Sequence, residues 1–577
     1  MRRALVAYGA LCALVWLAVW SVYRTPSFAA LTPSERAAIV ARVRRGDPVV
    51  EPKSITVGAT FVRRFGERIK GDVVVARAPI VAGIAPAFAL SLVAGLDGIG
   101  VDVGTPELGH QEAWLLPDEL LRADALAGET PLSAMDFELG ARKEVIDALL
   151  AKELGLDDDA FARAKKSYFR FRTDAFIEAA DLASILPVTR GNTPGPRLSA
   201  SALRDGAVAG GRYLLRHLYD DGRFGYEYTP ATDVDEAYGL DYSLPRHAGA
   251  AYFLAQLFGA THDVAFRDGA RRALDFLAAR QPGACQAAAR SCVANPDLHG
   301  ADLGAAAMAL LAVGQYVKAT GDRLELVWAR RLAAFVLFMQ KPDGDFCHLY
   351  DPGTDLRDEK TKLLYFSGEA AFALAKLAAL VGPSDPDYAR WTSALDRALE
   401  YLTDKQYANL AGQFFFGEDH WTCMAADAGW DALPPAHREK YARFCDGFVG
   451  FLRRTQFTAR DAITRAQPDF IGSYGFSPFL PPHGTPVGSR SEATISTYAM
   501  QERRGLADSD EGRATREQIR LGMQFLLDHQ VRDDNAWLMA NPDAARGGFL
   551  MSDVKRYIRV DFVQHSCSAM LRAIPLF

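Results

Sequence analysis

The stretch FVLFMQKPDGDF, residues 335–346, contains a phrase that recurs six times along the chain. An aromatic residue opens the phrase, and in five of the six copies a glutamine stands five places later, whereas Leu218 takes that place in the first copy. Self-similarity of this kind predicts one helix–loop–helix unit used six times. The copies begin 63, 59, 66, 50 and 74 residues apart, at Tyr213, Phe276, Phe335, Tyr401, Phe451 and Phe525.

Each unit is expected to hold two helices of different kinds. The first helix ends at the aromatic-to-glutamine phrase, a loop then returns to an aromatic residue after most copies, and a helix rich in Ala and other small residues follows. Small residues suit close packing around an axis, and six pairs can close into a ring in which no repeat keeps an uncovered face. The sequence therefore predicts a mainly α protein with an (α/α)6 toroid over residues 201–577.

The segment QKPDGDF, which begins at Gln340, resembles the repeat motif of terpenoid cyclases and their prenyltransferase relatives. The same toroid carries six-hairpin glycosidases, polysaccharide lyases and sugar epimerases. The resemblance implies the ring architecture, but it does not choose among these activities, because one fold hosts many functions.

Composition limits the class of protein and its partners. The 577 residues are 49% hydrophobic and carry a net charge of -6, which is typical of an ordinary globular protein of two or more domains and gives no basic footprint for nucleic acid. Seven cysteines do not make a disulfide scaffold, although Cys285 and Cys292 could close a short disulfide within one loop. The sequence alone cannot pair the others near the repeats, Cys347, Cys423, Cys445 and Cys567.

The first 30 residues are predicted to be an export signal. Two arginines precede an apolar run over residues 4–23, whose helix would span about 30 Å, the thickness of one hydrocarbon core. Residues 27–29 offer a small-x-small cleavage site, so a removed signal peptide is an alternative, and an apolar helix of a cytosolic protein is another. Because the positive charge comes first, we expect an anchor in the inner membrane with the bulk of the chain in the periplasm, within the cell envelope.

Between the signal and the ring, the sequence predicts a smaller domain with flanking connectors. Residues 31–50 are polar and Arg-rich and are expected to form a tether, and residues 187–200 a Pro/Gly-rich linker. Residues 51–186 combine β-branched runs bounded by glycines with an amphipathic helical stretch, KEVIDALLAKELGL at 143–156. This combination predicts an α+β domain.

Three pieces of this domain, within about residues 85–182, resemble the C-terminal half of the AMMECR1 family. They are GIGVDVGTPELGHQEAWLLPDELL, KEVIDALLAKELGL and SYFRFRTDAFIEA. The family's Leu-Arg-Gly-Cys-Ile-Gly turn is missing, and GERIKGDVVVA stands in the comparable region. The resemblance implies a fold and no reaction, so we expect an accessory domain that packs on the toroid.

Ionisable and aromatic side chains gather where each inner helix is expected to start, and in a toroid those starts converge at one mouth. A polar residue before a helix caps free N–H groups, and the helix dipole favours a carboxylate there. Capping does not account for histidines and arginines at positive helix ends, so a functional cavity is expected. The side chains at these points are Asp241, Tyr242, Arg246, His247, His299, Asp302, Tyr365, Glu369, Glu418, Asp419, His420, Trp421, Arg490, Glu492, Tyr557, Arg559, Asp561 and His565.

Carboxylates and histidines at this mouth are the candidates for acid/base catalysis, because burial or a neighbour can keep one carboxyl protonated. Asp241 and Asp561 are the first choices, and His247 and His565 are the next. The further catalytic candidates are Glu369, Asp419 and Glu492. Arginines could clamp a sugar acid or a phosphate, and aromatic rings could offer flat faces to sugars, with ordinary core packing as the alternative for any one ring. The candidate substrate-binding residues are Tyr242, Arg246, Tyr365, Trp421, Arg490 and Arg559.

A zinc site is the rival interpretation. DFVQHSCSAML, residues 561–571, resembles the zinc-binding helix of protein prenyltransferases, which implies His565 as a ligand together with Cys347 or Asp345. The other elements of that family are not evident, so no cofactor is predicted, and a buried, hydrogen-bonded histidine is expected instead.

These observations favour a carbohydrate-active enzyme of the cell envelope, a hydrolase, lyase or epimerase that acts on a glycan in the ring. A non-catalytic toroid that binds a glycan or a protein during envelope assembly is the first alternative. A terpenoid cyclase or prenyltransferase is the second, although the chain contains neither an Asp-x-Asp-Asp nor an Asp-Asp-x-x-Asp motif.

Overall fold

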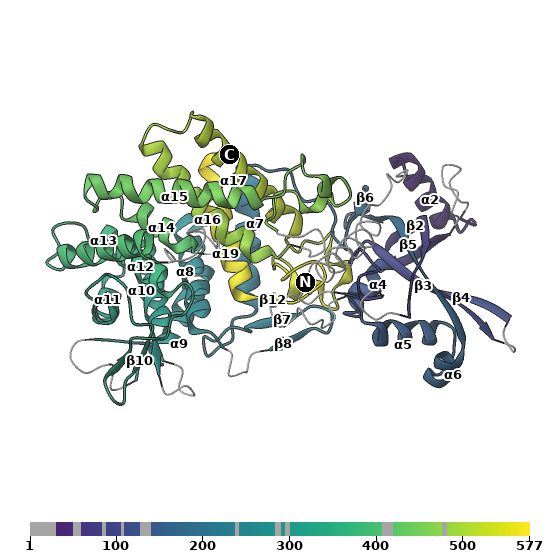
Figure 1. Cartoon of the computed structure of the whole chain (residues 1–577), viewed down its shortest axis with the longest axis horizontal. Helices are drawn as coiled ribbons and strands as arrows, with labels where there is room; N and C mark the ends of the chain where they lie inside the picture. Colours follow the sequence, from purple (N-terminus) through teal and green to yellow (C-terminus); the bar gives the residue numbers. More distant parts are fainter. Residues whose placement is uncertain are drawn as a thin grey trace, which may run out of the picture.

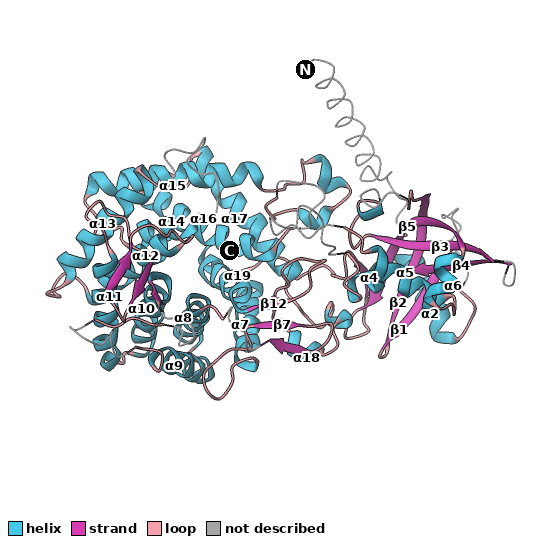
Figure 2. Ribbon diagram, turned by 60° about the horizontal axis from the view of Figure 1, so that its bottom comes forward, coloured by secondary structure: helices cyan, strands magenta, loops and turns pink. Residues whose placement is uncertain are grey.

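The computed structural model describes residues 31–49, 59–83, 88–105, 109–126, 140–236, 242–282, 285, 290–294, 300–406, 419–475 and 482–577. In these ranges the chain forms a large helical part and a smaller part built on a β-sheet (Figure 1). Figure 2 shows the main sheet at one end of the molecule, beside the helical part. The expected mainly α protein with a small sheet-containing domain is confirmed, whereas the apolar N-terminal run lies outside the described residues.

The smaller domain is organised by one antiparallel sheet. Its central strand is β5 (Lys165–Glu178), which pairs with β2 and β3 along most of its length. The sheet has the order β1 (Thr60–Phe65), β2 (Arg68–Pro79), β5, β3 (Asp97–Thr105) and β4 (Gly109–Leu115), with β6 (Ile185–Val188) also paired to β5.

Short helices complete this domain. Helix α5 (Lys143–Glu153) falls within the predicted amphipathic stretch and buries Ile146 and Leu150, which are four residues apart on one face. Helices α4 (Pro117–Arg122) and α6 (Asp158–Arg163) add further apolar side chains to the same core. The α+β prediction is thus confirmed, and the AMMECR1 resemblance stays a prediction.

The predicted tether is wrong, because Pro33–Arg45 forms helix α2 of the domain. Thr32 caps this helix by accepting a hydrogen bond from the Glu35 backbone N–H, and the Glu35 carboxylate accepts one from Thr32 N in return, a capping box. Ile39 and Val40 are buried against the sheet, and two arginines of α2 form ion pairs with acids of β5. The arginines therefore attach the segment to the domain.

The predicted linker is part of the contact between the two domains. Arg190 is 2% exposed and donates hydrogen bonds to Asp469 and Gln467 of the helical part. From the other side, Trp537 and Leu538 of the helical part enter the core of the smaller domain. The accessory domain packs on the helical part, as the sequence predicted.

Six inner helices of the larger part form a closed ring. Each contacts the next, and the last helix, α19, returns to contact the first, α8, so that no inner helix lies at an open end. The inner helices are α8 (Leu244–Thr261), α10 (Leu303–Thr320), α12 (Phe366–Val381), α14 (His420–Ala428), α16 (Gly484–Arg503) and α19 (Val560–Ala573).

Six outer helices cover this ring, and each precedes its inner partner in the chain (Figure 1). Every unit predicted from the repeat is therefore present, and the ring is an (α/α)6 toroid. The outer helices are α7 (Ala200–Arg216), α9 (Val264–Ala278), α11 (Leu326–Met339), α13 (Tyr388–Asp404), α15 (Pro435–Thr455) and α17 (Asp510–His529).

The repeated glutamine joins neighbouring units. The side-chain amide of Gln340 donates to the carbonyl of Gly344 in the loop that follows and to that of Ala394 in the next outer helix. Gln456 and Gln530 make the equivalent pair of bonds, to a loop glycine and to the next outer helix. In these three units the glutamine joins its outer helix to the next one, whereas Gln281 and Gln406 bond within their own units.

Glycine is required in the loop after the phrase. Gly472 has φ = 93°, and a Cβ there would lie 2.1 Å from the Leu521 carbonyl oxygen of the next outer helix. Gly222, Gly344 and Gly547 repeat this geometry in three other units, each at positive φ and against a carbonyl of an outer helix. Only a residue without a side chain fits such a close approach.

Two disulfides lie in the ring. Cys285 pairs with Cys292, as the sequence allowed, and Cys423 of α14 pairs with Cys445 of α15. Cys347 and Cys567 are buried thiols. Among the described helices, α10 is long and apolar enough to cross a membrane, with a mean hydropathy of 1.2, but 78% of that window is buried inside the protein.

Candidate active site in the ring

Two histidines from separate inner helices face each other inside the ring. His420 is the first residue of α14, His565 lies in α19, and their ring centroids are 5.0 Å apart with the rings nearly perpendicular. Glu492 of α16 is fully buried, and its Oε2 lies 2.7 Å from His565 Nδ1. Trp421 packs against both imidazoles, with centroids 4.6 Å from His420 and 5.6 Å from His565.

This arrangement prepares His565 for proton transfer. A carboxylate at hydrogen-bond distance holds a proton on Nδ1, so the lone pair of the neutral ring is on Nε2. His420 lies at the edge-to-face position on the opposite side, with the Tyr365 ring 5.9 Å away. Three inner helices thus combine a buttressed imidazole, a second imidazole and an aromatic wall.

Three carboxyl groups near the histidines have raised pKa values. Burial raises the pKa of Glu369 to about 8, and the charges of Asp302 and Asp419 add to this effect. Burial likewise raises the pKa of Asp302 and of Asp419 to about 6 each. Within the described residues, Glu369 Oε2 and Asp419 Oδ1 are buried oxygens without a hydrogen-bond partner. Glu369 is therefore suited to donate a proton at neutral pH.

Asp561 has the opposite character. Burial opposes its ionisation, but Arg559 binds both carboxylate oxygens, at 2.6 and 3.0 Å, and Arg246 Nε lies 3.3 Å away, so the pKa of Asp561 stays below its usual range. Arg246 also donates to Tyr226 Oη at 2.7 Å, and its charge lowers the pKa of Glu369. Asp561 therefore anchors two arginines and is a poor proton donor.

Tyr365 carries backbone strain at this site. Its φ of 78° and ψ of −34° lie in a region that bulky residues avoid, and it directly precedes α12, which carries Glu369. Strain of this kind persists where the surrounding structure enforces it, and it is concentrated at functional sites.

Other predicted residues lie between the inner and outer helices, away from the ring interior. His247 is fully buried, 2.6 Å from Tyr242 Oη through Nδ1 and 2.9 Å from the Ala273 carbonyl through Nε2, and burial lowers its pKa to about 4. Its ring stacks on Phe276. His247 and Tyr242 therefore belong to the packing between α8 and α9.

Arg490 is placed similarly, because its guanidinium lies 5.1 Å from the ring centroid of Tyr474 in the loop beside the outer helices. Asp241, the joint first choice as acid or base, lies outside the described residues, together with His299 and Glu418. Of the predicted catalytic residues, the structure gathers Glu369, Asp419, Glu492, Asp561 and His565.

Sequence reasoning placed His420 and Asp302 at the mouth but did not select them as catalytic. The available signal was position, because each stands immediately at the start of an inner helix, where the backbone leads into the ring interior. Asp302 is also the N-cap of α10 and accepts a hydrogen bond from Ala305 N, which is enough to explain an aspartate at this position. Its second effect, raising the pKa of Glu369, was therefore not recognised from the sequence.

A metal could be held by a different set from the one predicted. His420, Glu492 and His565 have ligand atoms within 4.8 Å of one another, a two-histidine, one-carboxylate set. Of the predicted partners of His565, Asp345 is engaged by Lys341 and Lys362, and Cys347 is not part of this set within the described residues. Glu492 Oε2 contacts His565 Nδ1, whereas Glu492 Oε1 is a buried oxygen without a hydrogen-bond partner among the described residues.

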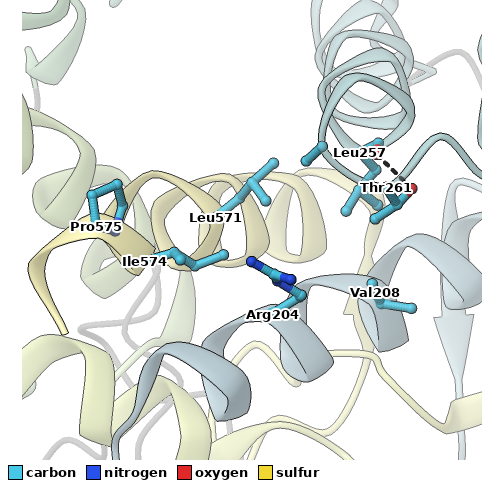
Figure 3. A pocket seen from close by; sticks show the side chains of 8 residues that line it. Arg204, Val208, Leu257, Thr261, Leu571, Ile574 and Pro575 are labelled. Atoms are coloured by element: carbon cyan, nitrogen blue, oxygen red, sulfur yellow. Dashed lines mark hydrogen bonds between the residues drawn. The ribbon is translucent and has the colours of Figure 1, made fainter.

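Two cavities of about 230 Å³ each open from the described part of the ring. The first, named here the lysine cavity, adjoins the histidine pair and is lined by His348, Lys362, Tyr365, Ser367, Lys405 and Asp419, among others. The second lies at the opposite ends of α8 and α19 and is mainly apolar, with Leu257, Leu571 and Ile574 around Arg204 (Figure 3). Of these two cavities, the lysine cavity is the one that includes an acid described above, Asp419.

Comparisons with known proteins bear on the fold. No family model matches the chain, and no curated protein matches it. A cellobiose 2-epimerase from Bacillus thermoamylovorans has a TM-score of 0.48 at 11% identity, over 66% of this chain and 99% of its own.

Two further solved structures are similar to the same extent. A sugar epimerase from a ruminal bacterium has a TM-score of 0.47 at 13% identity, over 65% of this chain and 98% of its own. An α-1,6-mannanase from Salegentibacter has a TM-score of 0.42 at 9% identity, over 65% and 99%. At such identities these similarities do not assign an activity.

Proposed function

We propose that the ring is a carbohydrate-active enzyme of the isomerase or epimerase type, which moves a proton at a sugar carbon next to a carbonyl group. The observation that carries the proposal is the pair of imidazoles, His420 and His565, 5.0 Å apart inside the ring. Two imidazoles in edge-to-face contact can both reach a substrate carbon that lies beside them, so that one removes its proton and the other returns one.

The remaining groups supply what such a step needs. One imidazole takes the proton from the carbon, the bonding pair moves into a carbon–carbon double bond, and the carbonyl oxygen receives a proton from Glu369 or a hydrogen bond from Arg246. Glu369 holds its proton because its pKa is about 8, and Arg246 keeps its charge beside Asp561. The other imidazole, which starts as an imidazolium, returns a proton to the carbon, and Glu369 takes its proton back from the oxygen. The two imidazoles then exchange protons with water, which restores the enzyme without another reagent.

Glycoside hydrolysis or elimination is the second candidate, favoured by one observation. Glu369 is a neutral carboxylic acid and Asp561 an ionised one, and the charge of Arg246 lowers the pKa of both. Unequal carboxyl groups of this kind are the acid and base of glycosidases. The histidine pair has no role in that reaction, whereas it is central to proton transfer at carbon.

The test is solvent exchange. The full chain, purified in detergent, is incubated in D2O with neutral and acidic mono- and oligosaccharides, and the products are analysed by NMR and mass spectrometry. Deuterium at the carbon next to the carbonyl, with no new reducing end, is the expected result. New reducing ends or unsaturated products without exchange would favour the hydrolase or lyase, and binding without any product a non-catalytic role in envelope assembly.

Metal dependence is tested in the same samples. Because His565 Nδ1 is hydrogen-bonded to Glu492, we expect full activity after dialysis against EDTA. Loss of activity on dialysis, with recovery on adding Zn²⁺ or Mn²⁺, would assign His420, Glu492 and His565 as metal ligands instead.

We also propose that the enzyme works in the cell envelope, anchored in the inner membrane by residues 4–23. The arginines before that apolar run support this orientation. The two disulfides fit an oxidising compartment such as the periplasm. Recovery of the full chain in the membrane fraction, and its release when residues 1–30 are deleted, would support the anchor; soluble full-length chain would oppose it.

A further inference from the structure

The lysine cavity lies near the histidine pair. Tyr365, whose ring lies 5.9 Å from that of His420, lines the cavity, and so does Asp419, which directly precedes His420. A substituent of a sugar bound beside His420 could therefore reach this space. A volume of about 230 Å³ is enough for one further polar group or ring.

Hydrogen-bond donors dominate one wall of the cavity. The Leu363 backbone N–H donates to His348 Nδ1 at 2.7 Å, so the proton of this imidazole is on Nε2, which lies 2.9 Å from Ser367 Oγ and donates to it. Burial lowers the pKa of His348 to about 4, which keeps the ring neutral. The Ser367 hydroxyl, 5% exposed, thus accepts from His348, and no acceptor for its own proton lies among the described residues. That proton is available to a ligand.

Lysines add positive charge to the same cavity. Lys405, directly after α13, has a long contact of 3.4 Å from Nζ to the Asp343 carbonyl and lies 6.0 Å from the ring centroid of Tyr401. Lys362 binds the Phe346 carbonyl at 2.9 Å and the Asp345 carboxylate, which Lys341 also neutralises. Two lysines, Lys362 and Lys405, therefore line the cavity together with Asp345 and Asp419, and Lys341 adds its charge at Asp345.

The backbone at the start of α12 also offers hydrogen-bond donors to the cavity. Ser367 and Gly368, in the first turn of α12, line the cavity, and no side-chain hydrogen bond from the residue before α12 caps this 16-residue helix. The first N–H groups of a helix carry partial positive charge and favour an anion. Side chains and backbone therefore offer donors to one ligand group.

The arginines expected to clamp an acid are occupied elsewhere. Arg246 and Arg559 share Asp561, and Arg490 lies over Tyr474. An acidic group entering the site would find Asp561 already between the first two. Recognition of an anion falls to the lysine cavity.

We propose that the lysine cavity binds an anionic group of the substrate, a carboxylate or a phosphate on a sugar, through Lys405, Ser367 and the start of α12. The enzyme then acts on an acidic carbohydrate. This inference rests on the proposed function for the reacting carbon, and it adds the substrate class.

The test compares matched sugars by calorimetry on the full chain in detergent: glucose, glucuronate and glucose 6-phosphate, and the galactose set. We expect an acidic member to bind at least about tenfold more tightly than its neutral counterpart, a difference of about 1.4 kcal/mol. Lys405→Met and Ser367→Ala should each remove most of that preference and leave neutral-sugar binding unchanged. Lys318→Met, which removes the same charge at the far end of α10, should change nothing.

The outcomes separate the two proposals. Preference for the uronates alone, or for the phosphates alone, identifies the anionic group. Equal binding of acidic and neutral sugars, no binding of any, or a preference that survives Lys405→Met would overturn the inference. Binding of an acidic sugar without deuterium exchange would preserve it and reject the proposed reaction, while exchange on neutral sugars alone would do the reverse.

Discussion

The interior of the ring and the packing layer between its inner and outer helices use the same residue types for different purposes. His565 faces the interior, where Glu492 directs it and His420 opposes it. His247 faces the packing layer, where Tyr242 and the Ala273 carbonyl engage both nitrogens. A histidine near the start of an inner helix can therefore be a candidate catalytic residue or a packing residue. The side of the helix on which it lies decides between the two.

The largest expected effect tests the interior. His565→Asn removes the proton-transferring nitrogen, so kcat should fall about 10³-fold, because a positioned general base contributes roughly 10²–10⁴. The melting temperature should change little. The measurement is exchange of deuterium into the substrate.

The matched control is His262→Asn. His262 is an exposed histidine at the end of α8 with φ = 56°, a conformation that asparagine tolerates. Its replacement should leave kcat intact. Equal rates for the His565 variant and the wild type would remove the histidine pair from the mechanism.

The packing layer is tested by His247→Asn. The variant loses the contact with the Ala273 carbonyl and the stacking on Phe276, so we expect unfolding to become easier by about 2–3 kcal/mol. Urea denaturation measures this change. Activity per folded molecule at low temperature should remain near that of the wild type, and a selective loss of turnover would place His247 in the site.

An effect that depends on pH distinguishes the acids. Glu369 has a folded pKa of about 8, above its ordinary value of 4.5, so the folded state binds the extra proton between these values and stability falls as the pH rises through that range. Glu369→Gln should abolish this fall, which amounts to at most about 1.4 kcal/mol per pH unit. Melting temperatures at pH 5, 7 and 9 give the comparison, and parallel curves for the two proteins would refute the assignment.

The smallest effect concerns His529, at the end of an outer helix. Burial disfavours its charge, but Asp553 raises its pKa to about 9, above the ordinary 6.5. The pair therefore stabilises the fold fully below about pH 6.5, and this contribution is lost as the pH rises towards 9. His529→Gln should be less stable than the wild type at pH 6 and nearly equal to it at pH 9. A constant difference across this range would show that the charge is not involved.

The repeat, the ring and the smaller domain could be predicted from the sequence because they depend on local patterns. One partner of the repeated glutamine is also local in sequence, since Gln340 bonds to the carbonyl of Gly344, four residues away. Which mouth residues enter the interior could not be predicted, because one residue of helix register turns a side chain by about 100°. His420 is the first residue of its helix and His247 is the fourth of its own, so the two side chains leave their helices in different directions.

Other failures came from partners distant in sequence. The Arg-rich segment 31–50 looked like a tether because the acids that pair with its arginines, Asp174 and Glu178, lie in β5. Its start, however, carried a readable signal, since Thr32 and Glu35 have the spacing of a capping box. Asp561 was a first choice for acid/base catalysis, although Arg559, which binds both of its oxygens, lies only two residues away. Its second partner, Arg246, reaches it only across the closure of the ring.

That closure also sets the order of events as the chain folds. The contact between α8 and α19 joins the first and last units, and Arg246 meets Asp561 only across it. Contacts so distant along the chain form slowly, after local helical hairpins. A chain that ends before α19 therefore lacks both His565 and the contact that closes the ring, so the proposed reaction requires the last helix to dock.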